Sequence, residues 1–299
     1  MCSEEGGGGM RILRAEAGEM DAGRPVKQFV RGAMGVSHRQ LSALKARGGM
    51  RVNGAVVRAN HLLAPGDVVE LALEDEGATA AAPEPGEVRI VYEDEDLYIV
   101  DKPAPMACQC TERQPSGTLE NRLAWRFREN EGFVFRPLNR LDRGTSGLMA
   151  AAKHAHACRL LQRQLHTPSF VREYLAVAEG ELAGEGTIDL PIAKADGATV
   201  RRAVDPAGRP AVTHYAALGV SNGRTLVRLR LETGRTHQIR VHLAHIGHPV
   251  AGDFLYGAEL PELPGRFALH SARIAFDHPI SGKRIERTSE LPEELRRLL

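Results

Sequence analysis

The stretch RPLNRLDRGTSG, residues 136–147, combines the residue types that a catalytic site requires. It places one carboxylate, Asp142, between two guanidiniums, Arg140 and Arg143, and follows them with Gly-Thr-Ser-Gly. The flanking arginines favour the charged form of Asp142, which makes it a competent nucleophile or base at neutral pH. The glycines would let the backbone approach a ligand closely, which a surface ion pair does not require. From these residues alone, a reactive carboxylate and an arginine-paired turn both remain open.

The composition is that of a globular protein with room for one large domain and a small one. The chain has 299 residues, of which 42% are hydrophobic and 26% are charged. The four cysteines are too few and too scattered for a disulfide framework, and they are Cys2, Cys108, Cys110 and Cys158. No secretory apolar segment and no run of membrane-spanning length is visible in the sequence. We therefore expect a cytoplasmic protein in a reducing compartment, with no membrane association.

The charges are distributed unevenly behind a net charge of +1. Residues 24–58 carry eight Lys or Arg and no Asp or Glu, whereas residues 74–96 carry nine acids against Arg89 alone. This pattern predicts a basic module that is joined by an acidic linker to a mixed remainder. The expected divisions are a flexible tail at 1–9, a small basic module at 10–73, an acidic linker at 74–88 and a large domain at 89–299.

The basic module contains signals for two helices followed by a small sheet. Residues 24–35 have a short helical pattern, and Ser37 with Gln40 predicts a capping box for a second helix that ends at Gly48. The pattern then changes to strands, with a hairpin turn at Asn53-Gly54. We expect a compact unit of mixed helix and strand.

The remainder alternates short strands with helices and long loops. Residues 224–233 alternate apolar and charged side chains, as in a half-buried antiparallel strand, and 172–182 also have strand character. These elements do not repeat as β-α-β units, so the predicted class is α+β with a mostly antiparallel, mixed sheet. The helices that we expect cover 118–130, 153–166, 236–246 and 292–299.

Part of the basic module resembles the αL RNA-binding motif, which a ribosomal small-subunit protein shares with several RNA-modifying enzymes. The resemblance covers VSHRQLSALKARGGMRVNGAVVRANHLLAPGDVVEL, residues 36–71. It implies a positive face for RNA phosphates, with Arg39, Lys45 and Arg47 at its centre. A solvated basic surface without a partner is the alternative, although surfaces that serve only solubility usually mix both signs.

Three separate segments of the remainder resemble the RluA/RluD-type pseudouridine synthases. RPLNRLDRGTSGLMAAAK is similar to that family's signature around an aspartate, and VREYLAVAEG is similar to its strand with an active-site tyrosine. ETGRTHQIRVHLAHIGHPVAGDFLYG is similar to its most recognisable segment. Asn139 departs from the family pattern, which has His before the arginine, and there we expect a changed hydrogen bond with activity retained.

The resemblance implies the pseudouridine synthase fold and a role for each of four residues. Asp142 would act at the ribose, Tyr174 would lie against the uracil, and Arg240 would pair with Asp142. Arg140 would occupy the space left when the uridine is extruded. Asp142 could form a covalent sugar adduct, stabilise an oxocarbenium-like state or abstract a ribose proton, and the sequence does not choose among these.

The implied activity is the isomerisation of uridine to pseudouridine, which requires no cofactor. The expected partner is structured RNA, with large-subunit ribosomal RNA favoured over transfer RNA, and the expected state is a monomer. We expect no metal site, although four histidines are close together in the sequence; they are His237, His242, His245 and His248. Two other functions remain as alternatives, namely a non-catalytic RNA-binding or ribosome-assembly factor and a nucleoside hydrolase, which would need a second carboxylate or a metal.

Overall fold

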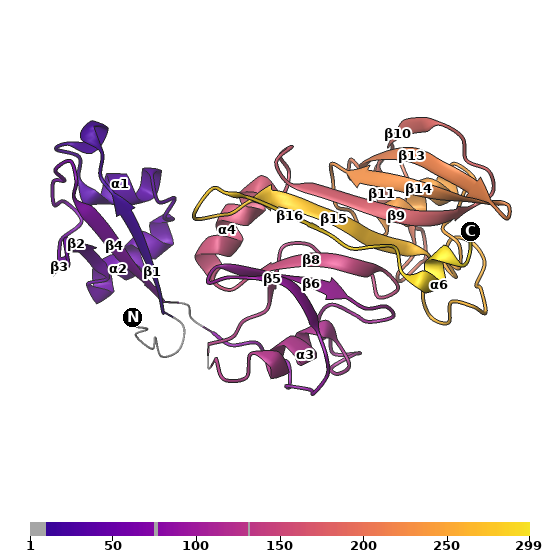
Figure 1. Cartoon of the computed structure of the whole chain (residues 1–299), viewed down its shortest axis with the longest axis horizontal. Coiled ribbons are helices and arrows are strands. Elements are labelled where there is room, and N and C mark those ends of the chain that lie inside the picture. Colours follow the sequence, from indigo (N-terminus) through magenta and orange to yellow (C-terminus); the bar gives the residue numbers. More distant parts are fainter. Residues whose placement is uncertain (1–9, 75–76, 131) are drawn as a thin grey trace.

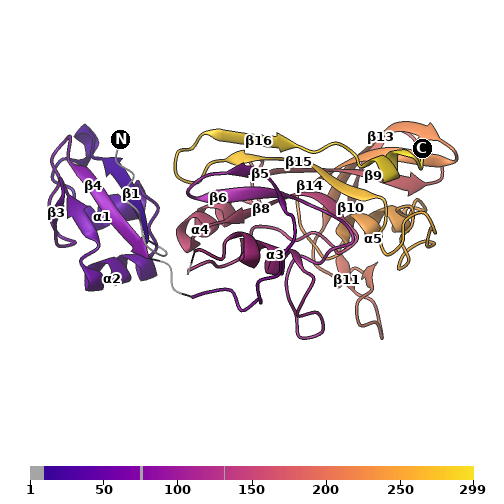
Figure 2. The same cartoon turned by 60° about the horizontal axis from the view of Figure 1, so that its bottom comes forward.

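The computed structural model describes residues 10–74, 77–130 and 132–299 (Figure 1). The predicted tail at 1–9 lies outside these described residues. Figures 1 and 2 show residues 10–74 at one end of an elongated molecule, beyond helix α4 (Ala155–Gln164) and the turn between strands β15 (Leu269–Asp277) and β16 (Arg284–Thr288).

Residues 10–74 form a small unit that has its own hydrophobic core. Its sheet has the strand order β1-β4-β2-β3 with every pair antiparallel. Two helices accompany the sheet, and the elements are β1 (Met10–Glu16), α1 (Val26–Gly32), α2 (His38–Arg47), β2 (Met50–Val52), β3 (Ala55–Val56) and β4 (Val68–Glu74).

The predicted capping box of α2 is confirmed. Ser37 Oγ accepts the Gln40 N–H at 3.2 Å, and Gln40 Oε1 accepts the Ser37 N–H at 3.0 Å. Gly48 ends the helix in the left-handed conformation, with φ at 66°. The expected order of two helices followed by a sheet was incomplete, because β1 precedes them. Burial alternates along β1, but its apolar residues do not, because Met10 and Ile12 are exposed on the face opposite Leu13.

The remainder is built on one large sheet that contains ten strands. Its order is β10-β13-β14-β9-β15-β8-β6-β5, with β16 on β15 and β7 on β8. Only β8 and β15 pair in parallel among the described strands, so the predicted α+β class with a mostly antiparallel, mixed sheet is confirmed. The other strands are β5 (Arg89–Glu93), β6 (Leu97–Lys102), β7 (Arg136–Pro137), β8 (Ser146–Ala152), β9 (Val171–Glu179), β10 (Glu185–Asp189), β13 (Val212–Ser221) and β14 (Arg224–Leu231).

The helices of this part are shorter than the sequence patterns predicted, because the residues that cap them lie within the predicted ranges. A separate two-stranded ribbon pairs β11 with β12. These elements are α3 (Leu119–Arg126), α5 (Gln238–His245), α6 (Glu293–Arg296), β11 (Ile192–Lys194) and β12 (Arg202–Val204). In the described part of the chain, no helix is long and apolar enough to cross a membrane. Cys108 and Cys110 are free thiols.

The small unit contacts the large one through a buried carboxylate, Asp96. Arg11 on β1 donates its Nε–H to Asp96 Oδ1 at 2.8 Å, and His154 Nε2 lies 2.9 Å from the same oxygen. Ile280, in the loop between β15 and β16, packs against the core of the small unit. These donors hold the pKa of Asp96 well below its usual value against the opposing effect of burial.

The segment 77–88 has no helix or strand, which agrees with its lack of periodicity. It nevertheless hydrogen-bonds to the region of α3. Thr79 N–H donates to Phe133 O at 2.9 Å, and Asn121 Nδ2 donates to Ala82 O at 2.9 Å. The segment therefore follows the surface of the large unit.

The parallel pairing of β8 with β15 depends on Gly147. Ser146 and Gly147 pair with His270 and Ser271, and Gly147 has a φ of 104°. A Cβ atom at this position would lie 2.3 Å from Ser271 O, which is backbone and has no room to move. The turn that carries Asp142 enters β8 immediately before this contact.

We predict that Gly147→Ala lowers the free energy of unfolding by more than about 3 kcal/mol, because it combines a positive φ with a backbone clash. Gly184→Ala is the matched control, since Gly184 also has a positive φ of 69° but open space around it. The control should lose about 1–2 kcal/mol. Urea unfolding measures both values, and equal losses would contradict the predicted clash.

Candidate active site

Asp142, Tyr174 and Arg240 line one open cleft with a volume of about 480 Å³. Asp142 lies in the turn that precedes β8, Tyr174 is on β9, and Arg240 is on α5. Arg140 also lines the cleft, and its side chain is exposed. The fold therefore brings together residues that are up to 100 positions apart, from 140 to 240.

Arg240 connects the cleft carboxylate to a second, buried carboxylate. Its Nη1 donates to Asp142 Oδ2 at 3.0 Å. Its Nε and Nη2 donate to the two oxygens of Asp253, at 2.6 and 2.8 Å. Asp253 is fully buried and Arg240 is 2% exposed, whereas the Asp142 side chain is 27% exposed. Asp142 is thus fixed from the protein side and open to the cleft.

Two aromatic rings pack against the Arg240 guanidinium. Its central carbon lies 4.0 Å from the centroid of Phe267 and 5.0 Å from that of Tyr256. A Cβ atom at Gly144 would lie 2.7 Å from the Phe267 ring. The expectation that the glycines of the signature admit a ligand was therefore wrong. Gly144 makes room for Phe267, and Gly147 makes room for β15.

Tyr174 is buried beside the carboxylate, with 5% of its surface exposed. Burial raises the pKa of its phenol above the ordinary value, and nearby Arg172 opposes this effect only in part. The phenol is therefore neutral at pH 7. Asn139, the departure from the family pattern, lines the same cleft, and its Oδ1 is buried with no hydrogen-bond partner among the described residues.

His237 belongs to the site, although the sequence patterns suggested it only as a metal ligand. The Tyr256 hydroxyl accepts the Arg202 N–H at 2.8 Å and lies 2.8 Å from His237 Nδ1. The hydroxyl proton therefore points to Nδ1, which leaves the ring proton on Nε2, 3.9 Å from Asp142 Oδ2. Burial lowers the pKa of His237 and keeps it neutral. His237 precedes α5 in the left-handed conformation, with φ at 59°, so helical spacing from Arg240 gives no signal that it belongs to the site.

Comparison with known proteins agrees with this geometry. Residues 96–245 match the family described as RNA pseudouridylate synthase. The ribosomal large subunit pseudouridine synthase D of Xanthomonas campestris is 38% identical, over 88% of this chain and 84% of that protein. This chain belongs to the RNA pseudouridine synthase family. It is therefore an isomerase, and RNA is its partner.

Other relatives of this pseudouridine synthase give the same assignment. An uncharacterized RNA pseudouridine synthase of Bacillus subtilis, YhcT, is 39% identical over 88% of this chain and 85% of its own length. The solved structure described as human RNA Pseudouridylate Synthase Domain Containing 1 has a TM-score of 0.56 and 28% identity, covering 69% of this chain and 86% of that chain.

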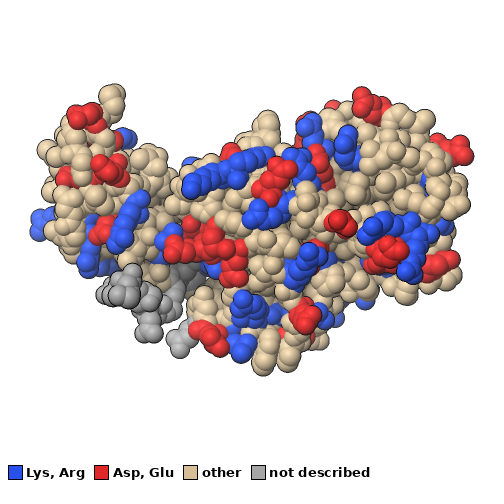
Figure 3. Space-filling model, viewed as in Figure 1, with Lys and Arg blue, Asp and Glu red and all other residues tan. Residues whose placement is uncertain are grey.

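The three cations predicted to bind RNA lie on the small unit and are exposed. Arg39 and Lys45 have no ion-pair partner in the part of the synthase that the structure describes. Arg47 instead pairs with Glu74, with 2.7 Å between Nη1 and Oε2, which makes it a weaker candidate. On the face of the large unit drawn in Figure 3, basic and acidic side chains are interspersed.

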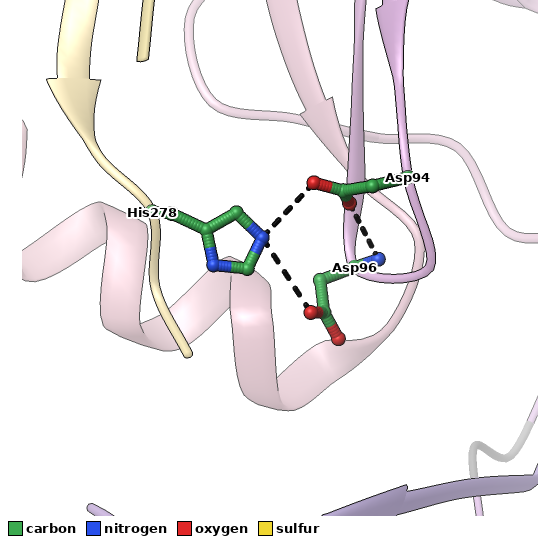
Figure 4. A group of neighbouring side chains, drawn as sticks. All are labelled: Asp94, Asp96 and His278. Atoms are coloured by element: carbon green, nitrogen blue, oxygen red, sulfur yellow. Dashed lines mark hydrogen bonds and ion pairs between the residues drawn. The ribbon is translucent and has the colours of Figure 1, made fainter. Parts of the chain in front are cut away.

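Asp94, Asp96 and His278 form a group whose ligand atoms lie within 4.8 Å of one another (Figure 4). His278 Nδ1 accepts the N–H groups of Ile280 and Ser281, so its proton is on Nε2. Nε2 donates to Asp94 Oδ2 at 3.0 Å and lies 3.5 Å from Asp96 Oδ2. A cation would have to displace these donors, so we interpret the group as part of the junction between the two units.

The histidines near Arg240 do not form a ligand set either. Both ring nitrogens of His242 are occupied, by Thr213 Oγ1 at 2.9 Å and Leu190 O at 2.9 Å. His248, which follows α5, has its Nδ1 3.0 Å from Glu179 O at the end of β9. Each of these rings therefore has a structural partner.

We predict that Asp253→Asn destabilises the synthase by about 3–5 kcal/mol, because it removes a buried countercharge from Arg240. Asp277→Asn is the matched control, since Asp277 pairs with Arg284 at the surface, where their side chains are 44% and 41% exposed. Its loss should cost less than about 1 kcal/mol. Urea unfolding compares the two variants. Equal small losses would show that Asp253 does not balance the charge of Arg240.

Proposed function

We propose that this synthase converts specific uridines of large-subunit ribosomal RNA to pseudouridine, with Asp142 as the residue that acts at the ribose. The observation that carries the proposal is the position of Asp142, whose carboxylate is held by Arg240 on one side and faces the cleft on the other. An ion pair at contact distance is worth on the order of 4 kcal/mol at an effective dielectric of about 20, before desolvation. This interaction holds the carboxylate in a fixed direction at the cleft.

The reaction breaks the bond between ribose and the ring nitrogen, turns the uracil, and joins the sugar to ring carbon five. It involves no change of oxidation state and needs no energy input. A single carboxylate near the anomeric carbon can act as a nucleophile, stabilise a cationic sugar or abstract a ribose proton. The open side of Asp142 allows each of these roles.

Tyr174 and Arg140 complete the proposed site. Tyr174, whose phenol is neutral, would lie against the uracil ring. The exposed guanidinium of Arg140 at the cleft would stack in the space that the flipped nucleotide leaves, which recovers part of the cost of unstacking.

The relatives and the basic module support the proposed target and setting of the enzyme. Proteins named ribosomal large subunit pseudouridine synthase D are 37% identical in Escherichia coli and 38% identical in Xanthomonas campestris. The exposed Arg39 and Lys45 of the αL-type module would contact RNA phosphates outside the cleft. We further propose that the enzyme acts as a cytoplasmic monomer, without a cofactor.

The two alternative functions fit the cleft less well. A non-catalytic RNA-binding factor has no need of an acid that faces phosphates, since it would repel them. A nucleoside hydrolase requires a second carboxylate or a metal to activate water. Asp142 is the only acid among the described residues that line the cleft, which disfavours hydrolysis.

We predict that Asp142→Asn abolishes pseudouridine formation, because an amide can neither attack the sugar nor act as a base. The affinity for RNA and the unfolding midpoint should stay close to those of the wild type. Pseudouridine mapping on large-subunit RNA from a deletion host, treated with each protein, measures product. Asp277→Asn is the surface control and should keep full activity. An Asp142→Asn protein with a tenth of the activity would refute the assignment.

We predict that the double variant Arg39→Gln/Lys45→Gln makes the salt dependence of RNA binding shallower. The magnitude of the slope of log affinity against log salt should fall by about 1–2, since each lost phosphate contact removes about 0.7–0.9. Arg296→Gln/Arg297→Gln is the control of equal charge change, at the C-terminal end of α6, which lies at the opposite end of the molecule from the module (Figure 1). Filter binding over a series of salt concentrations measures the slopes. An unchanged slope in the first variant would remove the module from the RNA interface.

A further inference from the structure

Arg172 is a buried arginine that has no counterion among the described residues. It is 4% exposed, and its Nε and Nη2 are buried with no hydrogen-bond partner among the described residues. It lines the catalytic cleft together with Tyr174. The two residues are separated by one position on β9, so their side chains lie on the same face of the sheet, about 6–7 Å apart along the strand.

The protein around Arg172 does not neutralise its charge. Asp142, the acid of the cleft, is already engaged by Arg240 at 3.0 Å. Glu173 alternates to the opposite face of β9 and pairs with Arg273 at 3.0 Å. Because a guanidinium does not lose its proton in proteins, Arg172 remains a buried cation, and burial without a partner opposes folding.

Gly234, in the loop beside Arg172, leaves room for its guanidinium. A Cβ atom at Gly234 would lie 3.1 Å from Arg172 Nη1, so a larger residue there would crowd the head group. In the same cleft, Asn139 Oδ1 is a buried acceptor that also has no partner within the described chain. Arg172 and Asn139 therefore both line the cleft, and each has a polar group without a partner in the described chain, for which a bound nucleotide could supply one.

We propose that Arg172 binds a backbone phosphate of the flipped uridine nucleotide. The inference rests on the proposed function, because it takes RNA as the ligand of the cleft. Uracil is neutral, so only the phosphates of the nucleotide can balance the charge of Arg172. Arginine binds phosphate through two parallel charge-assisted hydrogen bonds. The phosphate contact and the stacking against Tyr174 would together fix the sugar between them, in front of Asp142.

The first test combines protein and RNA changes. Arg172→Met removes the charge and keeps an apolar stem, and Arg228→Met is the matched control on the exposed face of β14. The RNA is a large-subunit fragment that the wild type modifies, with a neutral methylphosphonate at either phosphate next to the target uridine. Arg172→Met should weaken binding about 10- to 100-fold on unmodified RNA. It should have little further effect on RNA that carries the methylphosphonate at the contacted phosphate.

The second test uses the free protein and does not depend on RNA. An arginine with a structural role loses stability when it is replaced, whereas an unpaired buried cation does not. The melting temperature of Arg172→Met should therefore equal or exceed that of the wild type. Inorganic phosphate should raise the melting temperature of the wild type and of Arg228→Met by more than that of Arg172→Met.

The outcomes separate this inference from the proposed function. Suppose that the wild type forms pseudouridine, but the affinity loss caused by Arg172→Met is the same on every methylphosphonate RNA as on unmodified RNA. Arg172 then does not bind those phosphates. The inference would also be overturned if Arg172→Met melted at a lower temperature than the wild type and inorganic phosphate raised both melting temperatures equally. If the wild type forms no pseudouridine, the proposed function fails, and the phosphate response still decides on Arg172. Arg172→Lys, which keeps the charge, should retain affinity within about tenfold of the wild type.

Discussion

The ion pairs of Arg240 are the constraint on which the rest of the site depends. A guanidinium that is 2% exposed is stabilised in the interior only if its donors have anionic partners in good geometry. Asp253 supplies two of these contacts from full burial, and Asp142 supplies the third from the edge of the cleft. Because Asp253 holds Arg240 in place without any ligand, the remaining donor has a fixed direction. That direction positions the carboxylate of Asp142.

Packing around the ion pairs of Arg240 explains the two glycines that follow Asp142, which charge alone does not explain. Phe267 lies 4.0 Å from the Arg240 guanidinium, and it occupies the space that the absence of a side chain at Gly144 provides. Gly147 then allows the backbone of β8 to approach Ser271 on β15. The two glycines thus connect the reactive turn to the aromatic support of Arg240 and to the centre of the sheet. A substitution at either position would move the carboxylate by moving its supports.

The sequence predicted the elements and residues that have strong local signals. The capping box of α2 depends on residues three positions apart, and the class of the sheet follows from alternation along single strands, so both were predicted correctly. The strand β1 was missed because its apolar residues do not alternate, with Met10 and Ile12 on the face opposite Leu13. The roles of Gly144, Asp253 and His237 could not be predicted, because they depend on partners such as Phe267 that are distant in the sequence. Resemblance indicated that Arg240 pairs with Asp142, but the sequence contains no sign that Asp253 holds the other side.

The contact between the two units bears on how an RNA would be selected. Arg11 on β1 donates to Asp96, which also lies beside His154 and His278. The strongly lowered pKa of Asp96 shows that this carboxylate is charged and satisfied by its donors over the physiological range. A module attached through a charged, buried group is held at a set position, whereas one attached only by a chain segment would rotate freely. Under the proposed function, an RNA would have to present its phosphates and its flipped uridine at matching positions, so recognition would depend on RNA shape more than on base sequence.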